Sequence, residues 1–382
     1  MIKIDFIKKP STHLIFLAIL MLVLFCLSRF QPMDDNFYYL DFSKKLASGQ
    51  FGFSIPGFHG ADFLTAIIYL VSGSEYSVII LDLFFAFACI FMVYLAVAEI
   101  FKNKTAAIFA AYLYLLNPLD YTNVLRGGHH TPFIFFTLLG VYLLYKNSKW
   151  SWLAMGFSYI IRPFSIALAP LYWQQKKMKQ FYFSLIIPAV YVGAEYLQIH
   201  RIIIGAHDSL TTGGLFSFQR LILNLGYAFQ NYFSIHNFSF LHPLDLADMI
   251  HLSPLVTFLA VLAIIYPSRF LFEPRLFKSL VASSALALVI PASFYHLDMW
   301  YLWTFNFCLI LLALPVIKAL PKLVPIIVAS FGFQFLYLYL ASENSYWLAG
   351  NYILFYIFGI IFVTSVIYFL IINKKDENID CC

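Results

Sequence analysis

Long runs of apolar residues recur along the whole chain, and short polar segments separate them. Such runs predict helices that cross a membrane, because about 20 mostly apolar residues are needed to cross about 30 Å of hydrocarbon. We therefore expect an all-α polytopic membrane protein with about ten full spans. The expected spans are residues 12–30, 76–101, 105–120, 131–146, 180–200, 251–268, 276–294, 300–317, 323–341 and 348–372.

Residues 150–175, WSWLAMGFSYIIRPFSIALAPLYWQQ, differ from these runs because lysine-bearing segments, KNSK and QQKKMKQ, flank them on both sides. A single crossing would place the two lysine segments on opposite sides of the membrane. Proline ends helices and disfavours helical backbone at the residue before it. We therefore expect two short helices that form a hairpin with its break at Arg162-Pro163.

Residues 31–75 form the first long segment between expected spans. Within it, DDNFYYLDFSKKLASG predicts a short amphipathic helix that ends at Gly49. Residues 62–73 predict a second helix that is too short to cross the bilayer. Aromatic residues and lysines suit helices that lie at the membrane interface, so Asp34 and Asp35 should be held near the boundary between lipid and water.

The composition supports the membrane assignment. Hydrophobic residues make up 62% of the chain, charged residues only 11%, and the mean hydropathy is +0.81. A soluble protein of this size carries far more charge on its surface, so we exclude that class. We expect one integral membrane domain over residues 1–382, with an outer loop at 201–250 and the C-terminal spans at 251–372. No nucleic-acid partner is expected.

The distribution of lysine and arginine predicts the orientation. With the N-terminus inside, seventeen of the 24 basic residues fall in cytoplasmic segments, six fall outside, and Arg162 lies within the membrane. Both termini are therefore expected in the cytoplasm. Nine of the ten histidines, all but His13, and most of the acids fall at the outer ends of spans. Longer outer loops explain part of this bias, and chemistry on the outer face would explain the rest.

Asp34 and Asp35 are the first candidate site. Two adjacent carboxylates repel each other unless a cation, a hydroxyl group or a basic side chain lies nearby. The alternative is that they only cap a helix in a solvated loop, where aspartate is common.

The first half of the chain resembles the membrane glycosyltransferases of the GT-C class, in the branch of protein mannosyltransferases and aminoarabinose transferases. The resemblance covers about residues 12–200 and rests on the first helix, the paired acids and "LASG", and on three longer stretches. These are HGADFLTAIIYLVSGSEYSVIILDLFFAFACIFMVYLAVAEIF, LYLLNPLDYTNVLRGGHHTPFIFFTLLGVYLLYKNSK and AMGFSYIIRPFSIALAPLYW. It implies transfer of a sugar from a polyprenyl phosphate or pyrophosphate to a lipid, glycan or protein acceptor outside the cell.

The resemblance also implies that Asp34 and Asp35 form the catalytic site. Asp34 would be the general base, and Asp35 would orient the acceptor or bind a divalent cation such as Mg²⁺ or Mn²⁺. The family often has an acid after the arginine of a later outer turn. This chain has RGGHH there, so His129 and His130 depart from that pattern.

The leaving phosphate requires positive charge at membrane depth, where an arginine is expensive and usually functional. Arg162 is our first candidate, because its planar fork fits phosphate oxygens; the alternative is a structural arginine that satisfies carbonyls freed by the proline break. Further donor-phosphate candidates are Arg126, His129 and His130, which could equally form a plain outer loop. The candidate substrate-binding residues are Tyr38, Tyr39, His296 and Asp298, although aromatic residues here also suit the ordinary interfacial belt.

Two other functions remain open. A transporter or flippase of lipid-linked sugars would need polar groups through the depth of its spans, and this chain has few. A ligase or polymerase of lipid-linked sugars usually has a longer, more basic outer loop. We expect a bacterial inner membrane, with the active site on its periplasmic or extracellular side.

Overall fold

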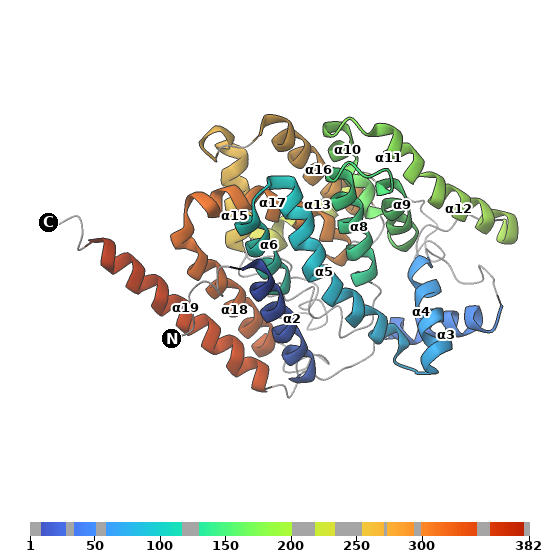
Figure 1. Ribbon diagram of the computed structural model, residues 1–382, viewed down its shortest axis with the longest axis horizontal. Helices are drawn as coiled ribbons and strands as arrows, with labels where there is room; N and C mark the ends of the chain where they lie inside the picture. Colours follow the sequence, from blue (N-terminus) through green and yellow to red (C-terminus); the bar gives the residue numbers. More distant parts are fainter. Residues whose placement is uncertain are drawn as a thin grey trace.

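The computed structural model describes residues 9–27, 34–50, 59–116, 130–200, 218–233, 254–270, 273–293, 299–341 and 352–377, and every regular element in these ranges is a helix. The expected all-α fold class is therefore confirmed for this part of the chain. Figure 1 shows the helices gathered side by side, with α19 (Tyr352–Glu377) projecting at one edge.

The first half of the chain contributes α2 (Pro10–Leu27), α3 (Asp34–Ala47), α4 (Gly60–Ser72), α5 (Ser77–Phe101), α6 (Lys104–Leu116), α8 (His130–Tyr145), α9 (Ser151–Ile161), η1 (Pro163–Leu168), α10 (Ala169–Gln174), α11 (Met178–Ser184) and α12 (Ile186–Ile199). The second half contributes α13 (Phe218–Phe233), α15 (Pro254–Ile265), η3 (Pro267–Phe270), α16 (Pro274–Ala292), η4 (Met299–Leu302), α17 (Trp303–Ala319), η5 (Pro321–Leu323), α18 (Val324–Ala341) and α19. Each expected span contains helix, and the span expected at 180–200 is divided between α11 and α12 at Leu185.

Within the described residues, fewer helices than expected are long enough to be full spans. Two of the described helices, Ser77–Phe101 and Pro274–Ala292, are long and apolar enough to cross a membrane. A third is added if Trp303–Ala319 and Pro321–Phe333, which meet at 114°, count as one span. The run expected at 105–120, for example, is described only as far as Leu116, and the helix in it, Lys104–Leu116, has 13 residues.

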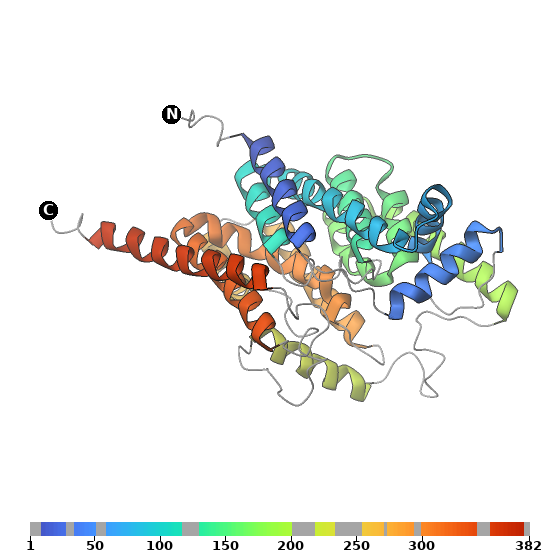
Figure 2. The ribbon, with the colours of Figure 1, turned by 90° about the horizontal axis from the view of Figure 1, so that it is seen from below.

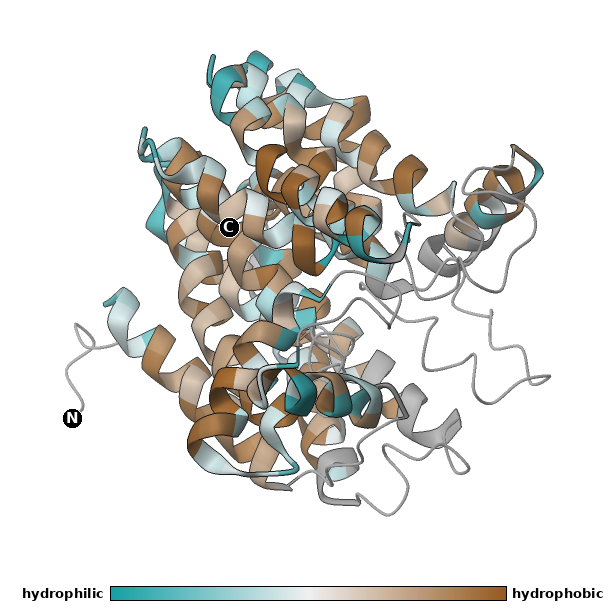
Figure 3. Ribbon diagram, turned by 90° about the vertical axis from the view of Figure 1, so that its right-hand side faces the viewer, coloured by the Kyte–Doolittle hydropathy of each residue, from teal (hydrophilic) through white to brown (hydrophobic). Residues whose placement is uncertain are grey.

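The outer surface of the helices is strongly apolar. In Figure 3 they are hydrophobic over most of their length, and hydrophilic residues lie mainly at helix ends and connections. Large side chains such as Phe16 on α2, Leu197 on α12 and Ile360 on α19 are more than half exposed. Exposed apolar surface of this extent suits contact with lipid better than contact with water.

Polar contacts define one end of the bundle. Glu99 at the end of α5 pairs with Lys102 and, at 2.7 Å, with Lys146 just after α8. The hydrogen bond to Glu99 holds the pKa of Lys146 above its usual value. The Tyr145 hydroxyl donates to Gln174 Oε1 at 2.9 Å, which brings the end of α10 to the same place. Three of the lysine-bearing segments expected on one side of the membrane therefore meet at one end.

The expected hairpin at Arg162-Pro163 is confirmed. Arg162 has extended backbone (φ −153°, ψ 129°) between α9 and η1. The Ser158 and Ser165 hydroxyls are 2.8 Å apart, and so are the Ser151 and Tyr172 hydroxyls. In a continuous helix the last two residues would be about 30 Å apart, so the chain turns back on itself.

Close backbone contacts fix the hairpin against its neighbours. A Cβ atom on Gly156 would lie 2.7 Å from the Ser184 carbonyl oxygen and 2.7 Å from Ile187 Cδ1. A Cβ atom on Gly60 would lie 2.8 Å from the Ile160 carbonyl oxygen. Only glycine allows α9 to approach α11 and α4 this closely.

We predict that Gly156→Ala lowers the free energy of unfolding by about 1–3 kcal/mol, because the added methyl group forces backbone to move. The matched control is Gly193→Ala on α12, where nothing lies within 4 Å of the added atom. This control should be neutral or slightly stabilising. Thermal unfolding of the detergent-purified proteins, followed by intrinsic fluorescence, measures the stability of both variants. Equal midpoints for Gly156→Ala and the unmodified protein would contradict the close contact.

Candidate functional site

The acidic pair lies in the first turn of α3, which begins at Asp34 as expected. One residue further on, the side chain of Asn36 is only 1% exposed, whereas Phe37 is 58% exposed. The carboxylate side chains of Asp34 and Asp35 lie outside the described part of the structure. Carboxylates in the first turn interact favourably with the positive end of the helix dipole.

The other end of α3 confirms the expected cap at Gly49, where φ is +80°. The Gly49 amide donates to the Leu46 carbonyl at 3.0 Å, and the Gln50 amide donates to the Lys45 carbonyl at 2.9 Å. This pair of bonds is the Schellman motif, which satisfies carbonyls at a helix C-terminus.

The exposed side of α3 carries the two candidate tyrosines. Tyr38 is exposed and Tyr39 half-buried, and their rings meet edge to face with centroids 6.0 Å apart. Lys44 donates to Glu75 at 2.7 Å and Lys45 pairs with Asp41 at 2.6 Å. The hydrogen bond to Glu75 raises the pKa of Lys44. These ion pairs are exposed, so each contributes at most about 1 kcal/mol.

Arg162 and His130, both predicted phosphate ligands, lie together. The Arg162 Nη2 atom is 3.4 Å from His130 Nε2, at the start of α8. Because guanidinium has no acceptor, Arg162 is the donor in this contact. The guanidinium also lies over the Tyr301 ring, 5.4 Å from its centroid, and Phe164 packs on that ring at 4.8 Å. Arg162 therefore occupies a half-buried position with aromatic and imidazole neighbours.

A second buried cluster was not predicted as a site. His59 Nδ1 lies 2.7 Å from Asp62 Oδ2, and the two residues are 2% and 1% exposed. The Phe42 ring stacks on the imidazole at 4.0 Å, and the Ser43 hydroxyl donates to the Asp62 carbonyl at 3.3 Å. The HGAD spacing puts His59 and Asp62 one turn apart, but nothing in the sequence shows that both are buried.

α12 and α9 complete the surroundings of this cluster. The His59 amide donates to the Tyr191 hydroxyl at 3.1 Å, and Tyr191 interacts electrostatically with Asp62 and Glu195. The neighbouring Gly60 lies against the Ile160 carbonyl, two residues before Arg162. Figures 1 and 2 show α3 and α4 together at one edge of the molecule. The His59 cluster and Arg162 therefore belong to the same end of the bundle, opposite the lysine-bearing end.

A buried aspartate on α5 lies at this end too. The Thr131 hydroxyl is 2.8 Å from both the Asp82 carbonyl oxygen and the Asp82 carboxylate Oδ1. Asp82 is 1% exposed and Thr131 follows His130 directly. This contact fixes the start of α8, and with it His130, against α5.

Several predicted site residues lie outside the described residues: Arg126, His129, His296 and Asp298. Among the described residues, no group of three or more histidine, cysteine, aspartate or glutamate side chains could hold a metal ion. The expected cation ligand, Asp35, has no described side chain, so we derive no step from a divalent cation.

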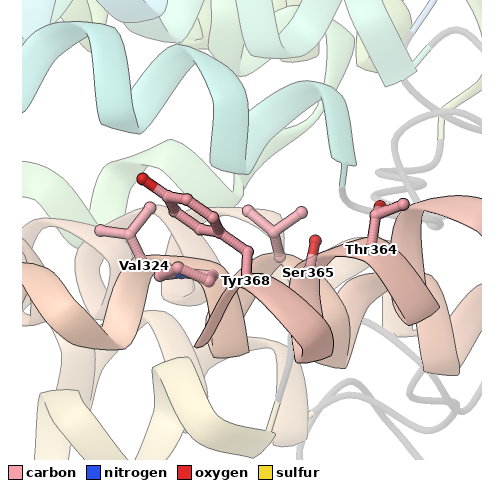
Figure 4. A pocket seen from close by; sticks show the side chains of 6 residues that line it. Val324, Thr364, Ser365 and Tyr368 are labelled. Carbon is pink, nitrogen blue, oxygen red and sulfur yellow. The ribbon is translucent and has the colours of Figure 1, made fainter. Parts of the chain in front are cut away.

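A groove between α18 and α19 lies elsewhere on the molecule. Figure 4 shows Tyr368 of α19 beside Val324 of α18, with Ser365 and Thr364 further along α19. Pro325 and Val328 complete its lining. Because its lining is mainly apolar and includes no carboxylate or basic side chain, this groove is a poor candidate for sugar transfer.

Comparisons of the chain with protein-family models, with curated proteins and with solved structures find no match.

We predict that Thr131→Val lowers the free energy of unfolding by about 1–3 kcal/mol, because the buried Asp82 oxygens lose a donor. The matched control is Thr364→Val on α19, where the exposed threonine bonds only to carbonyls of its own helix. This control should change stability little. Chemical or thermal unfolding in detergent measures the difference, and equal effects of the two substitutions would contradict a special role for the Asp82 contact.

Proposed function

We propose that this protein is an integral membrane glycosyltransferase that transfers a sugar from a polyprenyl-phosphate or pyrophosphate donor to an acceptor on the non-cytoplasmic face. The observation that carries the proposal is the placement of Arg162 beside His130 and Tyr301 at the break of a helical hairpin. α3, which begins at Asp34 and Asp35, is joined to this end of the bundle by the contacts of Phe42 and Ser43 with His59 and Asp62. A positive charge for the phosphate and a carboxylate for the acceptor proton would support transfer from a lipid phosphate.

The chemistry needs only one proton acceptor. Phosphate is a good leaving group, so the donor needs no strong acid, unlike the substrate of a glycoside hydrolase. Asp34 accepts the proton of the acceptor hydroxyl as the bond between the sugar and the phosphate breaks. The new glycosidic bond forms to the acceptor oxygen, and the lipid phosphate departs with the electron pair. Asp35 would orient the acceptor, or would hold a divalent cation if the reaction uses one.

Arg162 stabilises the negative charge on the departing phosphate. Its planar fork can donate two parallel hydrogen bonds to phosphate oxygens. The neighbouring His130 and Tyr301 hold the guanidinium in place without adding negative charge. Arg126 and His129 are further phosphate ligands in this proposal, and Tyr38, Tyr39, His296 and Asp298 bind the sugar or acceptor.

The proposal includes a topology. We propose that the shorter apolar helices also cross the bilayer, which gives about ten spans and a hairpin at Arg162. α3 and α4 lie at the outer interface, and both termini lie in the cytoplasm. The grouping of Lys102, Lys146 and the end of α10 supports a cytoplasmic face at the end opposite Arg162. A bacterial inner membrane fits this arrangement.

The first test is transfer by the purified protein in proteoliposomes, with a radiolabelled polyprenyl-phosphate sugar as donor. Asp34→Asn should abolish consumption of the donor, because the amide cannot accept the proton. Equal yield and an unchanged size-exclusion profile show that the variant is folded. Full activity of Asp34→Asn would remove the assignment of the base. Movement of the intact donor across the bilayer without its consumption would indicate a transporter instead.

The second test is kinetic. Arg162→Ala should raise the KM for the donor about 10-fold or more, with a smaller change in the acceptor KM, because charge-assisted hydrogen bonds contribute about 1.5–3 kcal/mol. Arg162→Lys should have an intermediate KM for the donor, because lysine keeps the positive charge but lacks the planar guanidinium group. Arg269→Ala, at an exposed arginine of η3, is the matched control. An unchanged donor KM in Arg162→Ala would leave this arginine a purely structural role.

A further inference from the structure

Two of the described contacts that join α3 to the rest of the protein are polar and differ in kind. The first is the exposed ion pair between Lys44 and Glu75. The second is the buried contact of Ser43 with Asp62, which in turn accepts a hydrogen bond from His59. Exposed pairs contribute little to stability or geometry, whereas buried hydrogen bonds tolerate little displacement.

The His59–Asp62 pair lies where three helices meet. Phe42 and Ser43 of α3 cover one side of it, and the Tyr191 hydroxyl of α12 accepts the hydrogen bond of the His59 amide. The next residue, Gly60, packs directly on the Ile160 carbonyl. Direct contacts therefore connect α3, through His59 and Gly60, to the end of α9, and Arg162 follows directly after α9.

Burial excludes a direct role in chemistry. His59 and Asp62 are 2% and 1% exposed, so neither side chain can touch an acceptor or a sugar in this conformation. Stability alone also explains the pair poorly, because well-packed apolar residues often replace a buried charged pair without loss. The pair supplies a directional hydrogen bond, which an interface between apolar side chains lacks.

We propose that His59 and Asp62 are positioning residues that fix the orientation of α3 and so hold Asp34 and Asp35 at a defined place relative to Arg162. The inference rests on the proposed function only where it concerns activity. The orientation of α3 can be measured without any substrate.

The structural test measures a distance between spin labels. One label replaces Phe37 on α3, one turn after Asp34, and the other replaces Phe84 on α5; the two side chains are 58% and 64% exposed. The background carries serine at Cys26, Cys381 and Cys382, while the buried Cys89 and Cys308 are left in place. We expect one narrow distance distribution in the background protein.

The variants separate position from stability. The double substitution His59→Phe with Asp62→Leu keeps the stacking on Phe42 and leaves no lone buried charge, so the protein should remain folded. It should shift the distribution or broaden it at least twofold. His59→Asn, whose amide nitrogen takes the place of Nδ1, should keep it narrow. Lys44→Gln, which removes only the exposed contact, is the matched control and should also leave it narrow.

The outcomes decide the proposal. An unchanged distribution in the double variant overturns it. A His59→Asn distribution as broad as that of the double variant overturns the role of the hydrogen bond, and an equal effect of Lys44→Gln transfers the role to the exposed pair. In the transfer assay, the double variant should lose about 10²-fold in kcat at an unchanged donor KM, because small misplacements of catalytic groups have effects of this size. If the unmodified protein transfers no sugar, the proposed function fails, and the distance measurement still tests the positioning role.

Discussion

Hydrogen bonds between buried hydroxyl groups hold the bend at Arg162, and the arrangement of the Arg162 end depends on that bend. The Ser158 hydroxyl lies 2.7 Å from that of Thr137 on α8 and 2.8 Å from that of Ser165 on η1. In apolar surroundings no water replaces such partners, so each hydroxyl group must find one inside the protein. Pro163 prevents α9 from continuing. The hydrogen bonds of Ser158 with Thr137 and Ser165 then determine where the returning chain lies. Without these hydrogen bonds the chain would still break at Pro163, but the direction of the returning segment, and with it the place of Arg162, would be less well fixed.

The bend brings together groups that are far apart in the sequence. Arg162 reaches His130 at the start of α8, and Thr131 ties that start to Asp82 on α5. Tyr301, from the second half of the chain, offers its ring face to the guanidinium. A half-buried charge is expensive, and the contacts with the imidazole of His130 and the ring of Tyr301 reduce that cost.

The sequence predicted the features that have a local cause, and it missed those that depend on packing. The break at Arg162-Pro163 follows from proline, and the end of α3 follows from Gly49, so both were predicted correctly. The His59–Asp62 pair was missed because a histidine and an aspartate three residues apart are common on any exposed helix, and burial depends on α3 and α12. α13 lies inside the segment expected to be an outer loop, although Phe218, Ile222 and Phe229 have helical spacing. The count of ten full spans exceeded what the described helices show, because several described apolar helices, such as α6 and α15, have only 12 or 13 residues. The roles of Asp34, Asp35 and Arg162 remain predictions.

Apolar packing alone would leave this end of the bundle poorly defined. In a membrane, lipid tails are as apolar as leucine, so helices gain little specificity from burying apolar side chains against one another. Position must then come from close backbone contacts and from polar contacts. This chain has few polar residues, yet Gly60, the His59–Asp62 pair and the Asp82–Thr131 contact all lie at the end that holds Arg162. The positional constraints are therefore concentrated around the arginine and α3, which is where a reaction that brings a lipid phosphate to a carboxylate would require them.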